Sequence, residues 1–278
     1  MSKSKGNLVT PAGLIQTHGA DAVRYWSCKA APGVDTAVDE AQMKIGRRLA
    51  VKLLNASKFV LGLGSGGSGS GGADGGVADT VDVTEPLDLA MLAQLVSVVD
   101  EATRAFEAYQ YQQALERTET FFWQFCDDYV ELVKSRAYGD GWSDTSARSA
   151  RAALSVALST LQRLLAPFLP FAAEEVWSWW QPGSVHRAAW PVAADLDIPG
   201  DAPGEVFAAA AAVLRETRKA KTMARKGMRS EVRRLEIDGS AAYLAAVRAA
   251  ADDVRAAGSV QELVLTESGE ARVLVELV

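Results

Sequence analysis

The chain has 278 residues, 49% of them hydrophobic, so it is long and apolar enough to build more than one core. Its two cysteines lie far apart and its two histidines accompany no Cys-x-x-Cys pair, which excludes a disulfide framework and gives no metal site. No apolar run reaches membrane-spanning length. A reduced, cytoplasmic protein is the simplest interpretation.

Charge is unevenly distributed along the chain, whose net charge is −6. Residues 1–60 hold nine basic and four acidic side chains, and residues 215–234 hold nine basic and two acidic ones. An acidic chain that gathers its cations in two segments favours a polyanion as partner. Two solvated helix faces are the alternative interpretation.

The first seven residues, Met1-Ser2-Lys3-Ser4-Lys5-Gly6-Asn7, alternate lysine with serine and end in Gly-Asn. Small residues let such a loop approach a phosphate closely, and the ammonium groups can neutralise the charge on a leaving pyrophosphate. The pattern therefore indicates a phosphate-facing loop. A solvated, charged terminus is the alternative.

Two short helices are expected after this loop. Thr10 has the residue type of an N-cap and Pro11 suits the first helical position, so the first helix is predicted over 11–18. Gly19 suits the position that follows a helix. The second helix is predicted to start in the segment Gly19-Ala20-Asp21-Ala22-Val23-Arg24-Tyr25-Trp26.

Residues 39–63 are predicted to form one long helix with two faces. At about 100° per residue, its cations fall within an arc of roughly 140°. The opposite, buried side is predicted to carry Leu49, Ala50, Val51, Leu53, Ala56 and Val60. The cationic side suits an RNA backbone, and it consists of Lys44, Arg47, Arg48, Lys52 and Lys58, with Asn55 among them. An ordinary amphipathic surface helix is the alternative.

A helical bundle is predicted beyond a flexible linker. Gly62–Gly76 contains nine glycines and three serines, a composition typical of linkers. Helices are then predicted over 86–107, 112–136, 143–166 and 171–180, with prolines at a kink before the last one; antiparallel helices of such lengths form a bundle. Its aromatic residues are mostly core, but an exposed ring can stack on an unpaired base, and Trp123 and Phe59 are the candidates.

The C-terminal part, 204–278, is predicted to be a basic helix followed by a small α/β module. The helix covers 205–224, and cations in and after it that could contact a nucleic-acid backbone are Arg218, Lys221 and Arg225. In the module, 260–266 and 271–278 alternate apolar and polar residues around Ser268-Gly269 and predict a hairpin. A further strand is predicted over 232–237, with a helix over 240–256 between the strands.

Several of these segments resemble class I aminoacyl-tRNA synthetases. The opening loop is similar to their Lys-Met-Ser-Lys-Ser signature without its first lysine, and the order of loop, short helix and Gly-Ala-Asp-Ala-x-Arg is that of the enzymes for aliphatic amino acids. Four further segments resemble the valyl-tRNA synthetase family: Lys52-Leu53-Leu54-Asn55-Ala56-Ser57-Lys58-Phe59-Val60, Phe125-Cys126-Asp127-Asp128-Tyr129-Val130-Glu131, Pro167-Phe168-Leu169-Pro170-Phe171-Ala172-Ala173-Glu174-Glu175-Val176-Trp177 and Ala189-Trp190-Pro191. The third of these is shared with the isoleucyl and leucyl enzymes.

The resemblance implies a mainly α fold in which successive segments of the chain have different functions. It predicts a signature loop and stem-contact region over 1–38, a basic-faced helix over 39–61, a linker over 62–85, an anticodon-binding helical bundle over 86–200, and a basic helix with a small α/β module over 201–278.

The resemblance also implies a function: the C-terminal, tRNA-binding part of a valine–tRNA ligase. Ser2, Lys3, Ser4 and Lys5 would face the phosphates of ATP, with Lys3 as the catalytic residue, and Mg²⁺ would accompany the ATP. ATP and valine would bind mainly through a Rossmann half that these residues do not contain, so the chain alone is expected to be inactive. The expected partner is valine tRNA, and neither DNA nor a membrane. The alternatives are a stand-alone tRNA-binding module and the equivalent part of an isoleucyl or leucyl enzyme.

Overall fold

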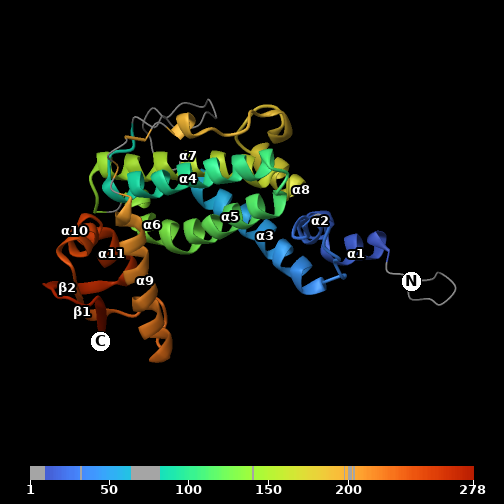
Figure 1. Ribbon diagram of the computed structural model, residues 1–278. Helices are drawn as coiled ribbons and strands as arrows, with labels where there is room; N and C mark the ends of the chain where they lie inside the picture. The colour runs from blue at the N-terminus through green and yellow to red at the C-terminus, as the bar shows by residue number, and fades with distance from the viewer. Residues whose placement is uncertain are drawn as a thin grey trace. The chain divides into compact units, whose positions relative to one another are not determined.

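The computed structural model describes residues 10–31, 33–63, 82–139, 141–196, 198–199, 202 and 204–278. Helices form most of this part, and one small sheet lies near the C-terminus (Figure 1). Within these ranges, no helix is both long and apolar enough to cross a bilayer. The chain packs as two units, the first made of Met1–Gly76, Val98–Phe121 and Leu158–Val192, the second of Val77–Ser97, Phe122–Ala157 and Ala193–Val278.

The helices follow the expected order along the chain. They are α1 (Pro11–His18), α2 (Ala20–Cys28), α3 (Glu40–Gly62), α4 (Pro86–Glu107), α5 (Tyr111–Gln124), α6 (Val130–Tyr138), α7 (Asp144–Leu165), α8 (Pro170–Trp177), α9 (Glu205–Met223), α10 (Ala241–Ala249) and α11 (Ala251–Gly258). The strands are β1 (Val232–Gly239), β2 (Val260–Glu267) and β3 (Arg272–Leu277). Three of the five unit boundaries fall inside helices, in α4, α5 and α7. The five functional parts named from the sequence stay a prediction.

Helix starts and stops agree closely with their sequence signals. Pro11 and Pro86 begin α1 and α4, because a proline lacks the N–H that an opening turn leaves unpaired anyway. Gly19, at φ 90°, follows α1 in a conformation that favours glycine. One detail differs: the Thr10 side chain makes no capping hydrogen bond, and its backbone alone precedes the helix in an extended conformation.

In the first unit, α2 holds the start of α8. The carboxylate of Asp21 accepts hydrogen bonds from the backbone N–H groups of Phe171 (3.1 Å) and Ala172 (2.8 Å), which the first turn of α8 leaves unpaired. Arg24 Nε donates to the carbonyl of Pro167 at 2.7 Å. The segment that begins with Gly19 and the proline-rich turn before α8 therefore depend on each other in space, although they lie about 150 residues apart.

In the second unit, a fully buried arginine links four helices. Arg136 of α6 donates from both terminal nitrogens to Asp88 of α4, each at 2.7 Å, and from Nε to Asp253 of α11 at 2.9 Å. Asp88 also accepts from Tyr129 Oη at 2.8 Å and from Ser149 Oγ of α7 at 2.6 Å. Every charge in this cluster therefore has a partner, as burial requires.

The predicted helix over 112–136 contains a wider turn. Residues Phe125–Tyr129 form a π-helix between α5 and α6. Phe125 and Tyr129 in this turn are both buried, their rings stack with centroids 5.8 Å apart, and Tyr129 meets Phe207 of α9 edge-on. Period 3.6 alone could not indicate such a turn.

The predicted hairpin is wrong. The strand order is β2-β1-β3, with β2 parallel and β3 antiparallel to β1. The connection after β2 instead passes the end of β1, where Ser268 N–H donates to the Gly239 carbonyl at 2.9 Å. The central position goes to β1 because its side chains Val232, Leu235 and Ile237 are fully buried. The helix predicted over 240–256 is also interrupted, at the buried Ala250, which leaves α10 and α11.

We expect the stability of this protein to depend on pH through Asp253. Burial raises the pKa of its carboxyl to about 6, with the Asp88 and Glu85 carboxylates adding to the shift and Arg136 opposing it. A carboxyl whose pKa is higher in the folded chain stabilises it below about pH 4 and loses that contribution as pH rises through 6. The wild-type free energy of unfolding, measured relative to Asp253→Asn, should therefore fall by about 2–3 kcal/mol between pH 4 and 7.

Urea denaturation at a series of pH values measures this difference. The matched control is Asp252→Asn, which removes a carboxylate from the exposed side of the same helix. A difference that stays constant with pH for Asp253→Asn, or the same trend for both variants, would contradict the role of Asp253.

Candidate nucleic-acid interface

The long cationic helix α3 is fixed at its start and along one side. The carboxylate of Asp39 caps it by accepting from the N–H groups of Ala41 (2.8 Å) and Gln42 (3.2 Å). Further along, Gly46 lies against Tyr25 of α2, and a Cβ there would come within 2.6 Å of the tyrosine Cβ. Glycine at this position is what lets α2 and α3 pack so closely.

The two faces of α3 are largely those predicted. Its buried side carries Met43, Leu49, Leu53, Ala56 and Val60. We call the opposite cations the α3 stripe: Lys44, Arg47, Arg48 and Lys58 are exposed, and Lys52 is half-buried. One residue was assigned to the wrong side. Val51 is 48% exposed, because it lies about 200° around the helix from Leu49 and from Leu53.

Much of the positive charge of the α3 stripe is not neutralised by protein carboxylates. Within the described part of the chain, Lys44, Arg47 and Arg48 form no salt bridge; Arg47 donates to the carbonyl of Thr17 at 3.4 Å. Lys58 lies over the ring of Trp179 at 5.8 Å from its centroid. Cations one turn apart repel each other unless an anion lies over them, so this surface suits a phosphate backbone.

The predicted base-stacking residues are not the most exposed rings. Phe59 and Trp123 are half-buried, and Trp123 contacts the Phe122 ring at 6.3 Å. Their role stays a prediction. Sequence reasoning passed over four more exposed aromatic residues. They are Tyr109, Phe171, Tyr138 and Trp179, at 85%, 68%, 56% and 38%. Tyr109 lies in the turn between α4 and α5 with φ 58°, and its place between two predicted helices was the signal that could have found it.

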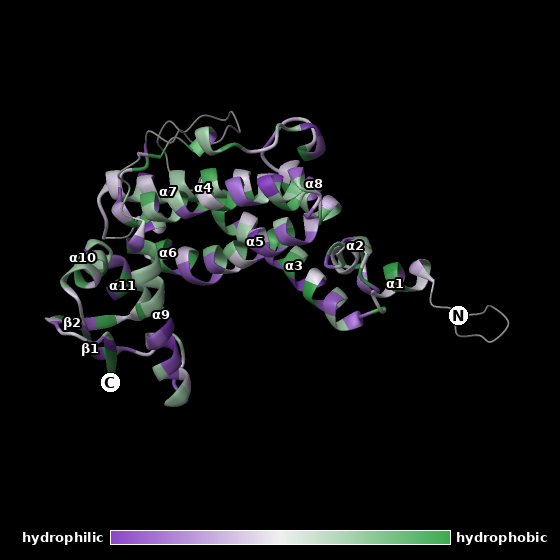
Figure 2. Cartoon of the chain, in the orientation of Figure 1, coloured by the Kyte–Doolittle hydropathy of each residue, from purple (hydrophilic) through white to green (hydrophobic). Residues whose placement is uncertain are grey.

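The second basic segment is partly committed to the fold. In Figure 2, α9 changes from hydrophobic in its first turns to hydrophilic further along. Arg215 pairs with Asp128 at 2.6 Å, and burial raises the pKa of that carboxyl although Arg215 opposes the shift. Arg218 donates to the Asp127 carbonyl and lies 3.7 Å from Glu131. Arg225, just after α9, is exposed and stays a candidate for a phosphate contact.

Lys221 does not fit the prediction that it contacts nucleic acid. Its residue is 1% exposed, and its ammonium donates to the carbonyls of Met228 (2.9 Å) and Gly258 (2.8 Å). Burial lowers its pKa, and Arg218 adds to the shift. Lys221 lies on the buried side of α9, as Thr217 does. It therefore links α9 to the two backbone carbonyls instead of contributing to a basic surface.

The predicted phosphate-facing residues Ser2, Lys3, Ser4 and Lys5 lie outside the described residues. Within the described ranges, no group of three histidine, cysteine or carboxylate side chains is arranged to hold a metal ion. The described part of the site is a cationic surface with exposed aromatic rings.

Two known protein families match parts of this chain. Residues 88–234 match the family described as "Anticodon-binding domain of tRNA ligase". This chain belongs to that family. Residues 1–39 match a second family, "tRNA synthetases class I (I, L, M and V)".

Individual relatives are similar over the whole chain. The valine–tRNA ligase of Salinispora tropica is 50% identical over 96% of this chain, and that of Thermobifida fusca is 52% identical over 100% of it. The matches cover 32% and 30% of those proteins, so the chain spans about a third of the length of these curated relatives.

A solved structure shares the fold. It is the crystal structure of the ternary complex of Agrobacterium radiobacter K84 agnB2 LeuRS, tRNA and LeuAMS, with a TM-score of 0.52 and 22% identity, covering 69% of this chain and 22% of that one. At this identity the likeness concerns the fold alone. The helices and small sheet of this chain, together with the family match, confirm the predicted mainly helical architecture of an anticodon-binding domain.

We expect Lys221→Met to destabilise the protein by about 1–3 kcal/mol, because the buried carbonyl of Gly258 and the part-buried carbonyl of Met228 lose their donor. Lys219→Met, on the exposed side of α9, is the matched control and should change stability by less than about 0.5 kcal/mol. Urea denaturation gives both values. At a temperature where the variant is folded, its affinity for tRNA should equal the wild type's; a fall in affinity with unchanged stability would return Lys221 to the interface.

Proposed function

We propose that this chain is the tRNA-binding part of a valine–tRNA ligase, the enzyme that uses ATP to attach valine to its tRNA. The observation that carries the proposal is identity of 50–52% to valine–tRNA ligases along the whole chain. Membership of the anticodon-binding family supports tRNA as the partner. Such chemistry serves translation, so the complete protein would work in the cytoplasm.

Two alternatives are less well supported. An isoleucyl or leucyl enzyme would share the helical fold, but the leucyl complex is 22% identical, against 50% for the valine relatives. A stand-alone tRNA-binding module would not need the class I synthetase segment at residues 1–39. Both comparisons favour a part of a valine enzyme.

The α3 stripe would bind the phosphate backbone of the tRNA, because its exposed cations include three that no described carboxylate pairs with. Arg225, in the basic segment 215–234, would add a phosphate contact. Arg218 would contribute less, because it already donates to the Asp127 carbonyl and pairs with Glu131. Backbone contacts position a nucleic acid but carry no sequence information. Preference for valine tRNA would therefore depend on residues that touch bases, for which Phe59 and Trp123 are the candidates.

The signature loop would act in the complete enzyme. Ser2, Lys3, Ser4 and Lys5 would lie over the phosphates of ATP, which would arrive with Mg²⁺. Lys3 would stabilise the charge that develops on the leaving pyrophosphate as valine adenylate forms. The chain by itself corresponds to about a third of its relatives and would not activate valine.

We expect charge reversal in the α3 stripe to weaken tRNA binding. The double variant Arg48→Glu/Lys52→Glu should bind every tRNA less tightly, because a cation that neutralises a phosphate does so whatever the sequence. The slope of log affinity against log salt should fall by about 0.7–0.9 for each phosphate that the variant no longer neutralises. Salt-titrated binding of valine and leucine tRNAs measures both effects.

The control is Arg148→Glu/Arg248→Glu, which makes the same change in net charge at exposed positions of α7 and α10. If both double variants lose affinity equally, net charge and not the α3 stripe governs binding. If neither loses affinity, the stripe is an ordinary solvated helix face.

In the complete enzyme, we expect Lys3→Ala to slow valine adenylate formation by roughly 10²–10³-fold, the usual effect of removing one donor to a developing oxyanion. Valine binding should change much less, because the lysine acts mainly in the transition state. Single-turnover ATP–pyrophosphate chemistry, measured without tRNA, separates the two. Lys44→Ala is the matched lysine control, and an unchanged adenylation rate in Lys3→Ala would remove Lys3 from catalysis.

A further inference from the structure

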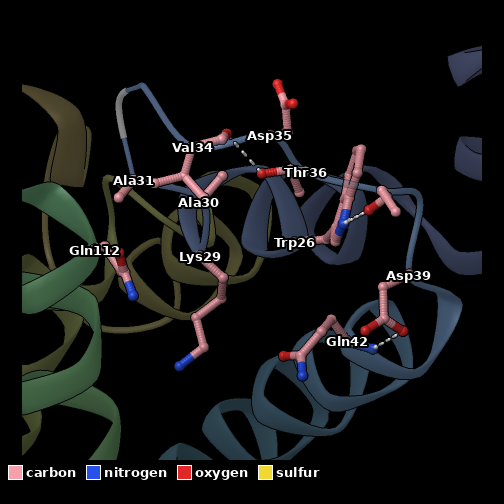
Figure 3. Close-up of a pocket in the computed structure, with 11 residues that line it drawn as sticks. Trp26, Lys29, Ala30, Ala31, Val34, Asp35, Thr36, Asp39, Gln42 and Gln112 are labelled. Atoms are coloured by element: carbon pink, nitrogen blue, oxygen red, sulfur yellow. Dashed lines mark hydrogen bonds between the residues drawn. The ribbon is translucent and has the colours of Figure 1, made fainter.

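A cavity of about 590 Å³ lies in the first unit, and neither Phe59 nor Trp123 belongs to its lining. Figure 3 shows its lining side chains coming from separate elements: Trp26 from α2, Lys29 just after it, Gln42 from α3 and Gln112 from α5. Residues 34–37 of the loop between α2 and α3 close another side. Sites for small molecules have volumes of about 300–1,000 Å³, so this cavity can hold a group as large as a nucleotide.

The lining combines an aromatic ring, small side chains and two primary amides. The indole N–H of Trp26 donates to the carbonyl of Ala37 at 3.2 Å, which fixes the ring at the edge of the cavity. Each glutamine amide can both donate and accept a hydrogen bond, as the edges of nucleobases do. Stacking on an aromatic ring together with hydrogen bonds to base edges is the usual recognition of an unpaired RNA base.

One amide has an acceptor that the fold does not use. Gln42 Oε1 is buried and finds no hydrogen-bond partner in the described part of the chain. Buried acceptors are almost always paired, so this oxygen indicates a donor that arrives with a ligand. The exocyclic amine or ring N–H of a base is a donor of that kind.

The charges around the cavity disfavour a phosphate. Lys29 is engaged by Glu119, whose carboxylate lies 3.3 Å from its ammonium and also accepts from Tyr25 Oη. Asp39 uses its carboxylate to cap α3, and Asp35 adds a second negative charge to the lining. A neutral, flat group with donors and acceptors on its edge fits this lining better than an anion does.

We propose that this cavity receives one unpaired base of the bound tRNA, stacked near Trp26 and hydrogen-bonded by Gln42 and Gln112. The proposal rests on the proposed function, because it assigns a base contact to the same tRNA whose phosphates the α3 stripe binds. It places a sequence-reading contact where α2, α3 and α5 of the first unit line one cavity, away from Phe59 and Trp123.

The first test uses the isolated chain and the four nucleoside 5′-monophosphates of adenosine, guanosine, cytidine and uridine. The indole N–H of Trp26 gives an NMR signal that Trp26→Phe identifies. At least one nucleotide should shift this signal in a saturable way, and Gln42→Leu or Gln112→Leu should abolish the shift. Gln113→Leu, an exposed neighbour on α5 outside the lining, is the matched control and should leave it intact.

The second test measures valine tRNA binding across a salt titration. Gln42→Leu/Gln112→Leu should weaken binding roughly tenfold, as removal of one base-binding group does, with the salt slope unchanged because the cations that neutralise phosphates are intact. Circular dichroism checks that the variant is folded, and Gln112→Leu alone is the milder second variant.

The outcomes separate this proposal from the proposed function. Binding of tRNA that the glutamine variants do not weaken, with no nucleotide shifting the Trp26 signal, overturns the base site and leaves the tRNA-binding function standing. No tRNA binding by the wild type overturns the function. A Trp26 signal that responds to the remainder of the complete enzyme but not to tRNA makes the cavity a packing surface and also overturns the base site.

Discussion

The second unit is organised around one buried positive charge. Arg136 is 1% exposed, and its guanidinium donates two hydrogen bonds to the Asp88 carboxylate and a third to the Asp253 carboxylate. Taking a cation out of water is unfavourable unless paired groups compensate, and removing one partner of such a pair typically destabilises a protein by about 3–5 kcal/mol. The helices α4, α6 and α11 must therefore pack so that Asp88 and Asp253 both reach Arg136.

The same cluster also holds α7, the start of α4 and the C-terminal module in place. Ser149 of α7 donates to Asp88 and its Oγ accepts from the N–H groups of Thr84 and Glu85, so the start of α4 is fixed by the same carboxylate. Because Asp253 belongs to α11, the C-terminal module joins the helices through this cluster as well as through apolar packing. Burial is the main reason why the pKa of Asp253 is higher than that of an exposed aspartate. The neighbouring Asp88 carboxylate adds to the shift, and Arg136 opposes it.

The helices could be predicted from local sequence, and their partners could not. Proline and glycine positions, caps and the 3.6-residue period gave α1, α3, α4, α7 and α9 nearly to the residue. The order of the strands depends on which one is buried, and the alternation in β2 and β3 is equally compatible with a hairpin and with two edges flanking β1. The π-turn at Phe125–Tyr129 similarly depends on tertiary packing against α9.

The same limit applies to the candidate site. The phase of α3 was enough to place Lys44, Arg47 and Arg48 on one exposed face, whereas counting cations in 215–234 overstated a surface from which Lys221 is buried and Arg215 is paired with Asp128. No sequence window could indicate the cavity, because Trp26, Gln42 and Gln112 are brought together from three helices or their ends. The first unit thus holds two chemically different surfaces. One is the cationic α3 stripe, in which Lys44, Arg47 and Arg48 form no salt bridge among the described residues, and the other is a cavity beside the buried acceptor Gln42 Oε1. Phosphates can bind the first whatever the sequence, and a base edge can satisfy the second, so an RNA is the kind of partner that uses both.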